Sequence, residues 1–127
     1  MILGTGGSSL AVAHALKKIE IPFTKVSRNP KNENEISYDS LTSDLINSTK
    51  LIINTTPLGM YPNISQYPNI PYEAITQDHL LYDLIYNPKQ SEFLGKGAKQ
   101  GAIVKNGFEM LINQAEYSWK IWNNIPF

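Results

Sequence analysis

Apolar positions along the chain change spacing several times, and each change predicts a new element. Short apolar runs without strict alternation are typical of strands that are buried on both faces. We expect such strands at residues 1–3, 23–27, 51–53, 80–84 and 102–104. Between the first two runs, Val12, Leu16 and Ile19 recur at helical spacing and predict a helix over residues 8–19. Further helices are expected over residues 41–48, 91–100 and 107–122.

Two polar stretches separate these elements and predict loops. Residues 28–37 are rich in asparagine, and residues 54–71 contain four prolines. Because strands and helices alternate without a hairpin signal, the strands are expected to be parallel and joined by crossover helices. The sequence therefore predicts a single domain, residues 1–127. Its expected fold is α/β, a Rossmann-like doubly wound parallel sheet of five strands in three α/β/α layers.

A glycine-rich turn lies between the first predicted strand and the first predicted helix. Gly4 permits a tight turn, and Gly6 lets the backbone approach a pyrophosphate closely. The free N–H groups and the dipole at the start of the helix favour such an anion. Ser9 stands where a third glycine is usual, and it is small enough for close packing. This position predicts a dinucleotide site, although the turn alone also fits a tight bend without a ligand.

The residues after the second predicted strand indicate which dinucleotide is bound. NAD sites place an acidic residue about 20 positions after the glycines, to hold the ribose 2′-hydroxyl. Here that region has no carboxylate and instead carries Arg28 and Lys31. A guanidinium and an ammonium suit a 2′-phosphate, so NADP is favoured over NAD. The alternative is an ordinary basic surface loop.

Composition excludes several other classes of function. The 11 basic residues balance 11 acidic ones, so no broad field favours nucleic acid or an anionic membrane. Cysteine is absent, which removes disulfides and thiolate chemistry and fits a cytoplasmic protein. No apolar run reaches the roughly 20 residues of a membrane span. His14 and His79 have no partner nearby in sequence, so we expect neither acid–base catalysis nor a metal site.

Three later segments are more specific than the glycine turn. They read NTTPLGM at residues 54–60, YDLIYNP at 82–88 and NGFEMLINQA at 106–115. In this order and spacing, and together with the glycine turn, they closely resemble the nucleotide-binding half of shikimate dehydrogenase over essentially the whole chain. The resemblance implies a reversible hydride transfer between NADPH and 3-dehydroshikimate, which gives shikimate in aromatic amino-acid biosynthesis.

The resemblance also implies roles for individual residues. The pyrophosphate is expected on the glycine turn, at Gly4, Thr5, Gly6, Gly7 and Ser8. The 2′-phosphate is expected on Ser27, Arg28, Asn29 and Lys31. Further cofactor contacts are expected from Thr55, Thr56, Leu84, Gly107 and Met110. The substrate is expected to contact Tyr86 and Gln114.

The last predicted helix carries most of the remaining expectations. Asn106 and Glu109 have the spacing of a capping box. Gly107, Met110 and Gln114 share one helical stripe, although Met110 taken alone favours core packing. A second stripe is expected to pack against the domain, and consists of Leu111, Ala115, Trp119 and Trp122. Asp83, at a strand end, is expected to hold the turn before Tyr86 rather than to act in catalysis.

The family also implies what this sequence lacks. In shikimate dehydrogenases a substrate domain precedes the glycine turn and supplies a lysine and an aspartate at the reacting carbonyl. No segment here matches either motif, and only three residues precede Gly4, where a strand usually has about five. We therefore expect a cofactor-binding half without catalytic residues, which needs the missing N-terminal domain for turnover. An exposed apolar surface is expected where that domain docks, and dimerisation is compatible with it. A stand-alone nucleotide-binding or regulatory module and a quinate-preferring relative remain alternatives.

Overall fold

A single six-stranded parallel sheet organises the protein. The computed structural model describes all residues, 1–127. Its strands are β1 (Ile2–Leu3), β2 (Lys25–Ser27), β3 (Glu35–Ser37), β4 (Leu51–Asn54), β5 (Leu80–Asp83) and β6 (Ile103–Lys105). They lie in the order β3-β2-β1-β4-β5-β6, and every neighbouring pair is parallel. The strand order reverses between β1 and β4, where α/β sheets of this order bind their ligands. The predicted Rossmann-like fold is confirmed.

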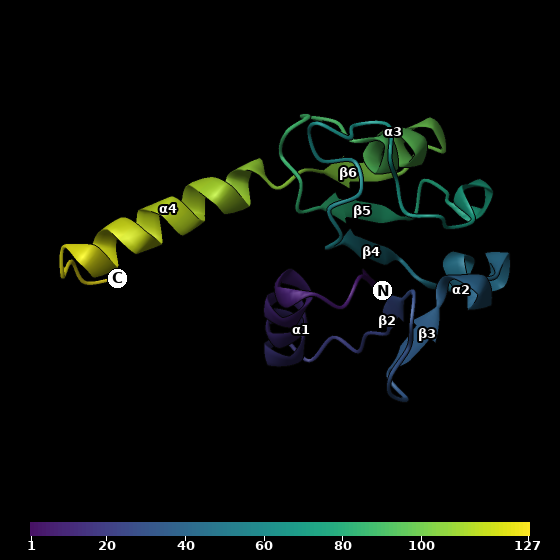
Figure 1. Cartoon of the computed structure of the whole chain (residues 1–127), viewed down its shortest axis with the longest axis horizontal. Coiled ribbons are helices and arrows are strands. Elements are labelled where there is room, and N and C mark those ends of the chain that lie inside the picture. The colour runs from purple at the N-terminus through teal and green to yellow at the C-terminus, as the bar shows by residue number, and fades with distance from the viewer.

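Four helices connect or follow the strands (Figure 1). They are α1 (Gly7–Lys18), α2 (Ser43–Ser48), α3 (Glu92–Lys99) and α4 (Phe108–Trp122), with 3₁₀ turns η1 (Tyr38–Ser40) and η2 (Tyr72–Ala74). The side chains of Thr42 and Ser91 cap α2 and α3 by accepting hydrogen bonds from backbone N–H groups. No helix combines the length and the apolar character that crossing a membrane requires.

The two faces of the sheet are covered unequally. The larger core lies on the side of α2, α3 and η2, and includes Leu3, Ile52, Leu81 and Phe93. On the other face a smaller core joins α1 to the sheet, and consists of Ile2, Ala13, Leu16 and Ile53. Beyond β4 this second face has no helix over it, and Ile103 of β6 is 66% exposed. The sheet is therefore covered on both faces only near α1, and its other end has helices on one face alone.

The expectation of a loop over residues 28–37 was wrong, because this stretch contains β3. The strand has only three residues, and Ile36 is its one apolar side chain. All three residues are half-buried, and β3 pairs with β2 alone at the edge of the sheet. An edge strand with polar neighbours gives no run of apolar residues, so its sequence resembles that of a loop. The sheet consequently has six strands rather than the expected five.

The packing role expected for the last helix was also wrong. No residue of α4 is buried, and Trp119 and Trp122 are 61% and 78% exposed. The capping box does not form, because Glu109 instead pairs with Lys105, whose Nζ lies 2.6 Å from its Oε2. Figure 1 shows α4 extending away from the rest of the molecule. Most of its large apolar side chains are thus exposed, although the Tyr117 ring packs against Phe127.

Candidate functional site

The loops that follow β1 and β4 meet at the carboxyl edge of the sheet. Thr55 joins them, because its backbone N–H and its Oγ1 both donate to the carbonyl of Leu3, at 2.9 and 2.6 Å. Gly4 turns the chain with a φ of +104°, and a Cβ there would lie 2.8 Å from Thr55 Oγ1. The tight turn predicted at Gly4 therefore requires glycine for both its conformation and its close packing.

The start of α1 presents unpaired backbone donors to this crevice. No side chain caps the helix, and its first turn contains no acidic residue. The N–H groups of Thr5 and Gly6 donate to no other atom of the chain. Ser9 is buried and its Oγ donates to the carbonyl of Gly6 at 2.7 Å, which fixes the turn. This arrangement suits an anion, because the donors and the helix dipole point to the same space.

A cavity of about 620 Å³, here called the β2 cavity, opens between the glycine turn and the end of β2. Most of the residues predicted for the phosphates line it, namely Gly4, Thr5, Gly6, Ser27, Arg28, Asn29 and Lys31. Two polar lining residues, Glu35 and Tyr38, were missed from sequence. Burial raises the pKa of Tyr38, and the nearby Arg28 guanidinium acts against that rise. The cavity therefore holds two cations, a carboxylate and a neutral phenol.

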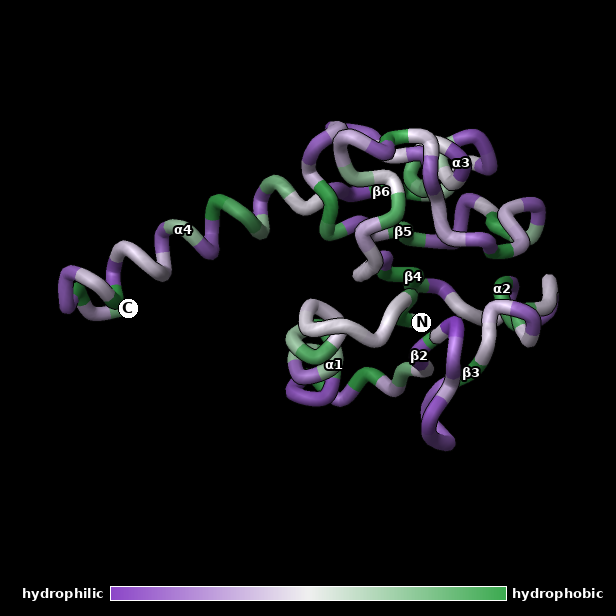
Figure 2. The backbone as a smooth tube through the Cα atoms, viewed as in Figure 1, coloured by the Kyte–Doolittle hydropathy of each residue, from purple (hydrophilic) through white to green (hydrophobic).

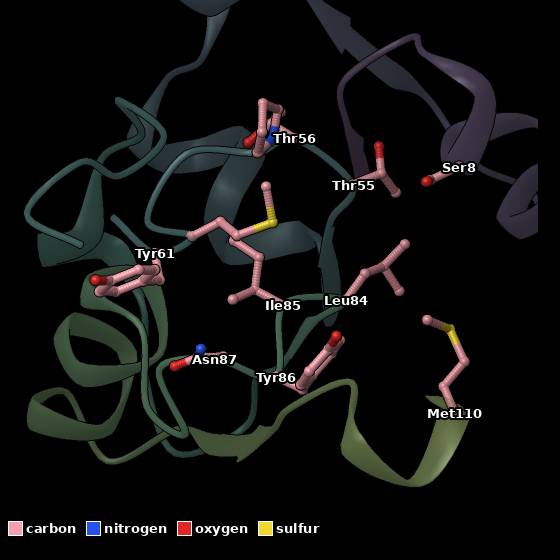
Figure 3. A pocket seen from close by; sticks show the side chains of 11 residues that line it. Ser8, Thr55, Thr56, Tyr61, Leu84, Ile85, Tyr86, Asn87 and Met110 are labelled. Carbon is pink, nitrogen blue, oxygen red and sulfur yellow. The ribbon is translucent and has the colours of Figure 1, made fainter. Parts of the chain in front are cut away.

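A second cavity of about 530 Å³, here called the β4–β5 cavity, adjoins the first. Figure 3 shows Ser8 and Thr55 at one side of it and Tyr86 and Met110 at the other. Leu84, also predicted, lines it as well. Three residues, Thr55, Thr56 and Pro57, line both cavities. The two cavities thus form one continuous crevice that crosses the point where the strand order reverses.

A buried polar network holds the walls of the β4–β5 cavity. Asn54 and Asp83, at the ends of β4 and β5, are fully buried, and Asn54 Nδ2 donates to Asp83 Oδ1 at 3.1 Å. Asn54 Oδ1 in turn accepts from the N–H and Oγ1 of Thr56. Asp83 also accepts from the N–H of Ile85 at 3.0 Å and from Ser91 Oγ at 2.5 Å. Burial raises the pKa of Asp83, and these three hydrogen bonds oppose that rise.

The network confirms the positional role predicted for Asp83, because its carboxylate ties the end of β5 to the first residues of the next loop. Asn54 was not singled out from sequence, although it opens the NTTPLGM segment. The signal that could have identified it is a polar residue at the end of an otherwise apolar strand. Such a residue is buried by its position and therefore needs hydrogen-bond partners.

Three predicted site residues, Gly7, Gly107 and Gln114, line neither cavity. Gly107 is buried, and a Cβ built there would overlap the Leu84 carbonyl, so glycine is required there by backbone packing. Gln114 is exposed on α4, one turn beyond Met110. Met110 itself is 38% exposed, so the alternative of core packing was wrong for it. The binding roles of all the predicted site residues stay predictions.

The two histidines are separated from this crevice. His79 is buried, where its Nδ1 accepts from the N–H of Thr76 and its Nε2 lies 2.9 Å from the Ile46 carbonyl. His14 is exposed on α1. No three histidine, aspartate or glutamate side chains are arranged to hold a metal ion. Apart from the Glu35 carboxylate, the polar groups of the crevice are mainly backbone amides, hydroxyls and cations, which suit a phosphorylated ligand.

The curated relatives that match the chain include shikimate dehydrogenases, and the matching structures also include a quinate dehydrogenase and a 5-ketofructose reductase. No family model matches the chain. The chain is 38% identical to the shikimate dehydrogenase (NADP(+)) of Methanococcus maripaludis in an alignment 138 residues long, gaps included. The alignment covers 98% of this chain and 49% of that protein. A crystal structure of a chorismate mutase/shikimate 5-dehydrogenase fusion protein from Clostridium acetobutylicum superposes with a TM-score of 0.83 at 35% identity, covering 99% of this chain and 48% of the other.

A third relative was solved with ligands bound. The shikimate 5-dehydrogenase of Thermus thermophilus, in complex with NADP(H) and shikimate, superposes with a TM-score of 0.80 at 25% identity. The match covers 97% of this chain and 48% of that one. The chain thus spans about half the length of the relatives it matches, and nearly all of the chain takes part in each match.

Proposed function

Since this chain is homologous over nearly its whole length to one half of the shikimate dehydrogenases, we propose that it is the NADP(H)-binding half of such an enzyme. The main observation that supports the proposal is that the two predicted anion sites, one for the diphosphate and one for the 2′-phosphate, lie in one crevice. The amides at the start of α1 and the Arg28–Lys31 loop border the same β2 cavity. One dinucleotide with a diphosphate and a 2′-phosphate would satisfy both sites.

The residues of the crevice fit the parts of this cofactor. The diphosphate would lie on the amides of Gly6, Gly7 and Ser8, where added Cβ atoms at either glycine would meet no other atom within 4 Å. Arg28 would hold the 2′-phosphate, with Lys31 adding a second positive charge. The nicotinamide end would enter the β4–β5 cavity between Thr55, Leu84 and Met110. When bound, the cofactor supplies or accepts the hydride.

The substrate side of the reaction is only partly provided by this chain. Tyr86 is 47% exposed and lines the β4–β5 cavity, where its hydroxyl would reach a hydroxyl or carboxylate of the substrate. We place no catalytic residue in this chain. Reduction of 3-dehydroshikimate to shikimate needs a polarised carbonyl held beside the cofactor. We propose that a polypeptide equivalent to the other half of the relatives supplies that function.

The surface of α4 supports docking of this complementary half. At 100° per residue, its apolar side chains form two opposed stripes. One stripe consists of Phe108, Leu111, Ile112, Ala115, Trp119 and Trp122, and the other of Met110, Tyr117 and Ile121. Figure 2 shows apolar segments along the whole length of this projecting helix. A helix that is apolar on opposite sides is normally enclosed by protein on both. Homodimerisation and a cytoplasmic location stay predictions.

Titration with reduced cofactors tests the binding proposal. Fluorescence should detect NADPH binding to the chain, with NADH binding at least about tenfold weaker for want of the 2′-phosphate contacts. Arg28→Gln should remove most of that preference by weakening NADPH alone. Lys18→Gln, which removes an exposed charge in the last turn of α1, is the matched control and should change neither affinity. Equal affinity of the wild type for the two cofactors would contradict the proposal.

A reconstitution assay tests the proposal for the whole reaction. The chain alone should turn over neither shikimate nor quinate with NADP⁺. Addition of the complementary half of a relative should restore oxidation of shikimate. Activity on quinate only would instead indicate the quinate-preferring alternative. Cofactor binding without activity in any mixture would favour a stand-alone nucleotide-binding module.

A further inference from the structure

The connection between β2 and β3 is unusually short for two parallel neighbours. Parallel strands usually need a crossover of about a dozen or more residues, most often a helix. Here only the seven residues 28–34 join Ser27 to Glu35, and they contain no helix. This loop carries both Arg28 and Lys31. Since no helix packs the loop onto the sheet, its shape depends on hydrogen bonds made by its own side chains.

Glu35, the first residue of β3, makes the most extensive set of these bonds. Its Oε2 accepts from the N–H of Lys31 at 2.8 Å, and its Oε1 accepts from Asn32 Nδ2 at 3.1 Å. Its own N–H donates to the Asn32 carbonyl at 3.1 Å. Asn32 Oδ1 also accepts from the N–H of Asn34 at 3.1 Å. The carboxylate therefore closes a hydrogen-bonded ring across residues 31–35. One of its oxygens binds the backbone N–H of Lys31, the second cation of the loop.

The position of this carboxylate is unfavourable for binding an anion. Glu35 lines the β2 cavity together with Arg28 and Lys31. A negative charge in a cavity that takes a phosphate repels it, and a neutral residue would remove that repulsion. A role in contacting the phosphate is thereby excluded for Glu35. The hydrogen bonds to the loop are what its carboxylate contributes.

We propose that Glu35 is a positioning residue for NADP selectivity, which holds the Lys31 turn so that Lys31 and Arg28 face the 2′-phosphate. The inference rests on the proposed function, because it assumes that this phosphate binds in the β2 cavity. It goes beyond that function by assigning cofactor preference to an acidic residue that does not touch the cofactor. Its sign is distinctive, because removal of a negative charge should weaken the binding of an anion.

Glu35→Gln and Glu33→Gln form a matched pair for the test. Both remove one negative charge from the same loop. Glutamine at 35 keeps one acceptor oxygen, so it can accept from only one of the two donors, Lys31 N–H and Asn32 Nδ2, and its NH₂ group would face the other. Glu33 is exposed and its side chain makes no hydrogen bond. Glu35→Gln should weaken NADPH binding by about three- to tenfold. Glu33→Gln should leave it unchanged or about twofold tighter, as charge removal on an exposed loop predicts.

NADH separates positioning from a general loss of structure. Neither variant should change NADH affinity, because NADH lacks the phosphate that the loop holds. Asn32→Ala provides a second variant, since it removes one partner of Glu35 without changing the charge. It should weaken NADPH binding in the same direction, by about two- to threefold. If the circular dichroism spectrum of Glu35→Gln shows that this variant does not fold, NADPH binding by Asn32→Ala decides the test.

The outcomes distinguish the inference from the function on which it rests. A wild-type chain without preference for NADPH contradicts the proposed function itself. A wild-type preference that Glu35→Gln leaves intact or increases overturns only the inference. Equal losses for NADPH and NADH also overturn it, because they would indicate a fold effect. A selective loss of NADPH binding in Glu35→Gln, absent in Glu33→Gln, is the result expected.

Discussion

The crevice between β1 and β4 and the helix α4 are built in opposite ways. The buried polar side chains that hold the crevice find their partners within the chain, whereas backbone donors at the start of α1 stay open. In contrast, α4 carries many large apolar side chains, and none of its residues is buried. The first region is thus complete as a scaffold and open only to a ligand, whereas the second lacks the protein surface it needs. On the proposed function, this difference leads us to expect that the chain forms a cofactor site alone but needs the complementary half for a whole active site.

The largest effect on the crevice is expected from breaking the network that holds it. Asp83→Ala leaves Asn54 Nδ2, Ile85 N–H and Ser91 Oγ without their acceptor in a buried site. We expect a loss of about 3 kcal/mol in the free energy of unfolding, measured with urea. Asp78→Ala, at an exposed aspartate before β5, should cost less than about 0.5 kcal/mol. Similar losses in the two variants would show that the network does not stabilise the crevice.

A smaller effect, on binding alone, is expected at Gly6. With φ of −77° and open space around an added Cβ, Gly6→Ala should fold normally. The new methyl group would nevertheless stand where the diphosphate approaches the backbone, so NADPH binding should weaken by about tenfold or more. Gly95→Ala in α3 also adds a Cβ in open space and should leave binding unchanged. If Gly6→Ala bound NADPH normally, the diphosphate would have to lie elsewhere.

The smallest effect on stability is expected on α4, which sharpens the contrast. Trp119→Ser should change the free energy of unfolding by less than about 0.5 kcal/mol, because this indole is exposed. Phe93→Ala, in the larger core, should cost about 3–5 kcal/mol in the same experiment. In the reconstitution assay, the same Trp119→Ser variant should fail to restore oxidation of shikimate when it is mixed with the complementary half. A large loss of stability in Trp119→Ser would mean that α4 packs on this domain after all.

The sequence predicted the crevice better than α4, and the reason is physical. The glycine turn and the NTTPLGM segment act through local geometry, so residues near each other in sequence define the walls. Gly4 and Thr55 are examples, since each directly follows a strand of the parallel sheet, and the pairing of those strands then brings the two residues into contact. The pattern of α4 correctly indicated a helix, but an apolar stripe does not specify its partner. Trp119 and Trp122 therefore looked like core residues of this chain.

Residues whose roles depend on contacts outside their own segment were the hardest to predict. Glu35 lies in an edge strand that resembles a loop, and it lines a cavity formed mainly by residues before β3. Tyr38 reaches the same cavity from η1. Gly107 has a conformation that any residue could adopt, and it is required only because the Leu84 carbonyl lies against it. None of these contacts leaves a periodic signal in the sequence.

The most direct test of the central claim is a crystal structure of the chain with NADP⁺. We expect the diphosphate on the amides of Gly6, Gly7 and Ser8, the 2′-phosphate on the Arg28 guanidinium, and the nicotinamide in the β4–β5 cavity. A cofactor bound elsewhere, or one whose 2′-phosphate makes no contact with Arg28, would contradict the account.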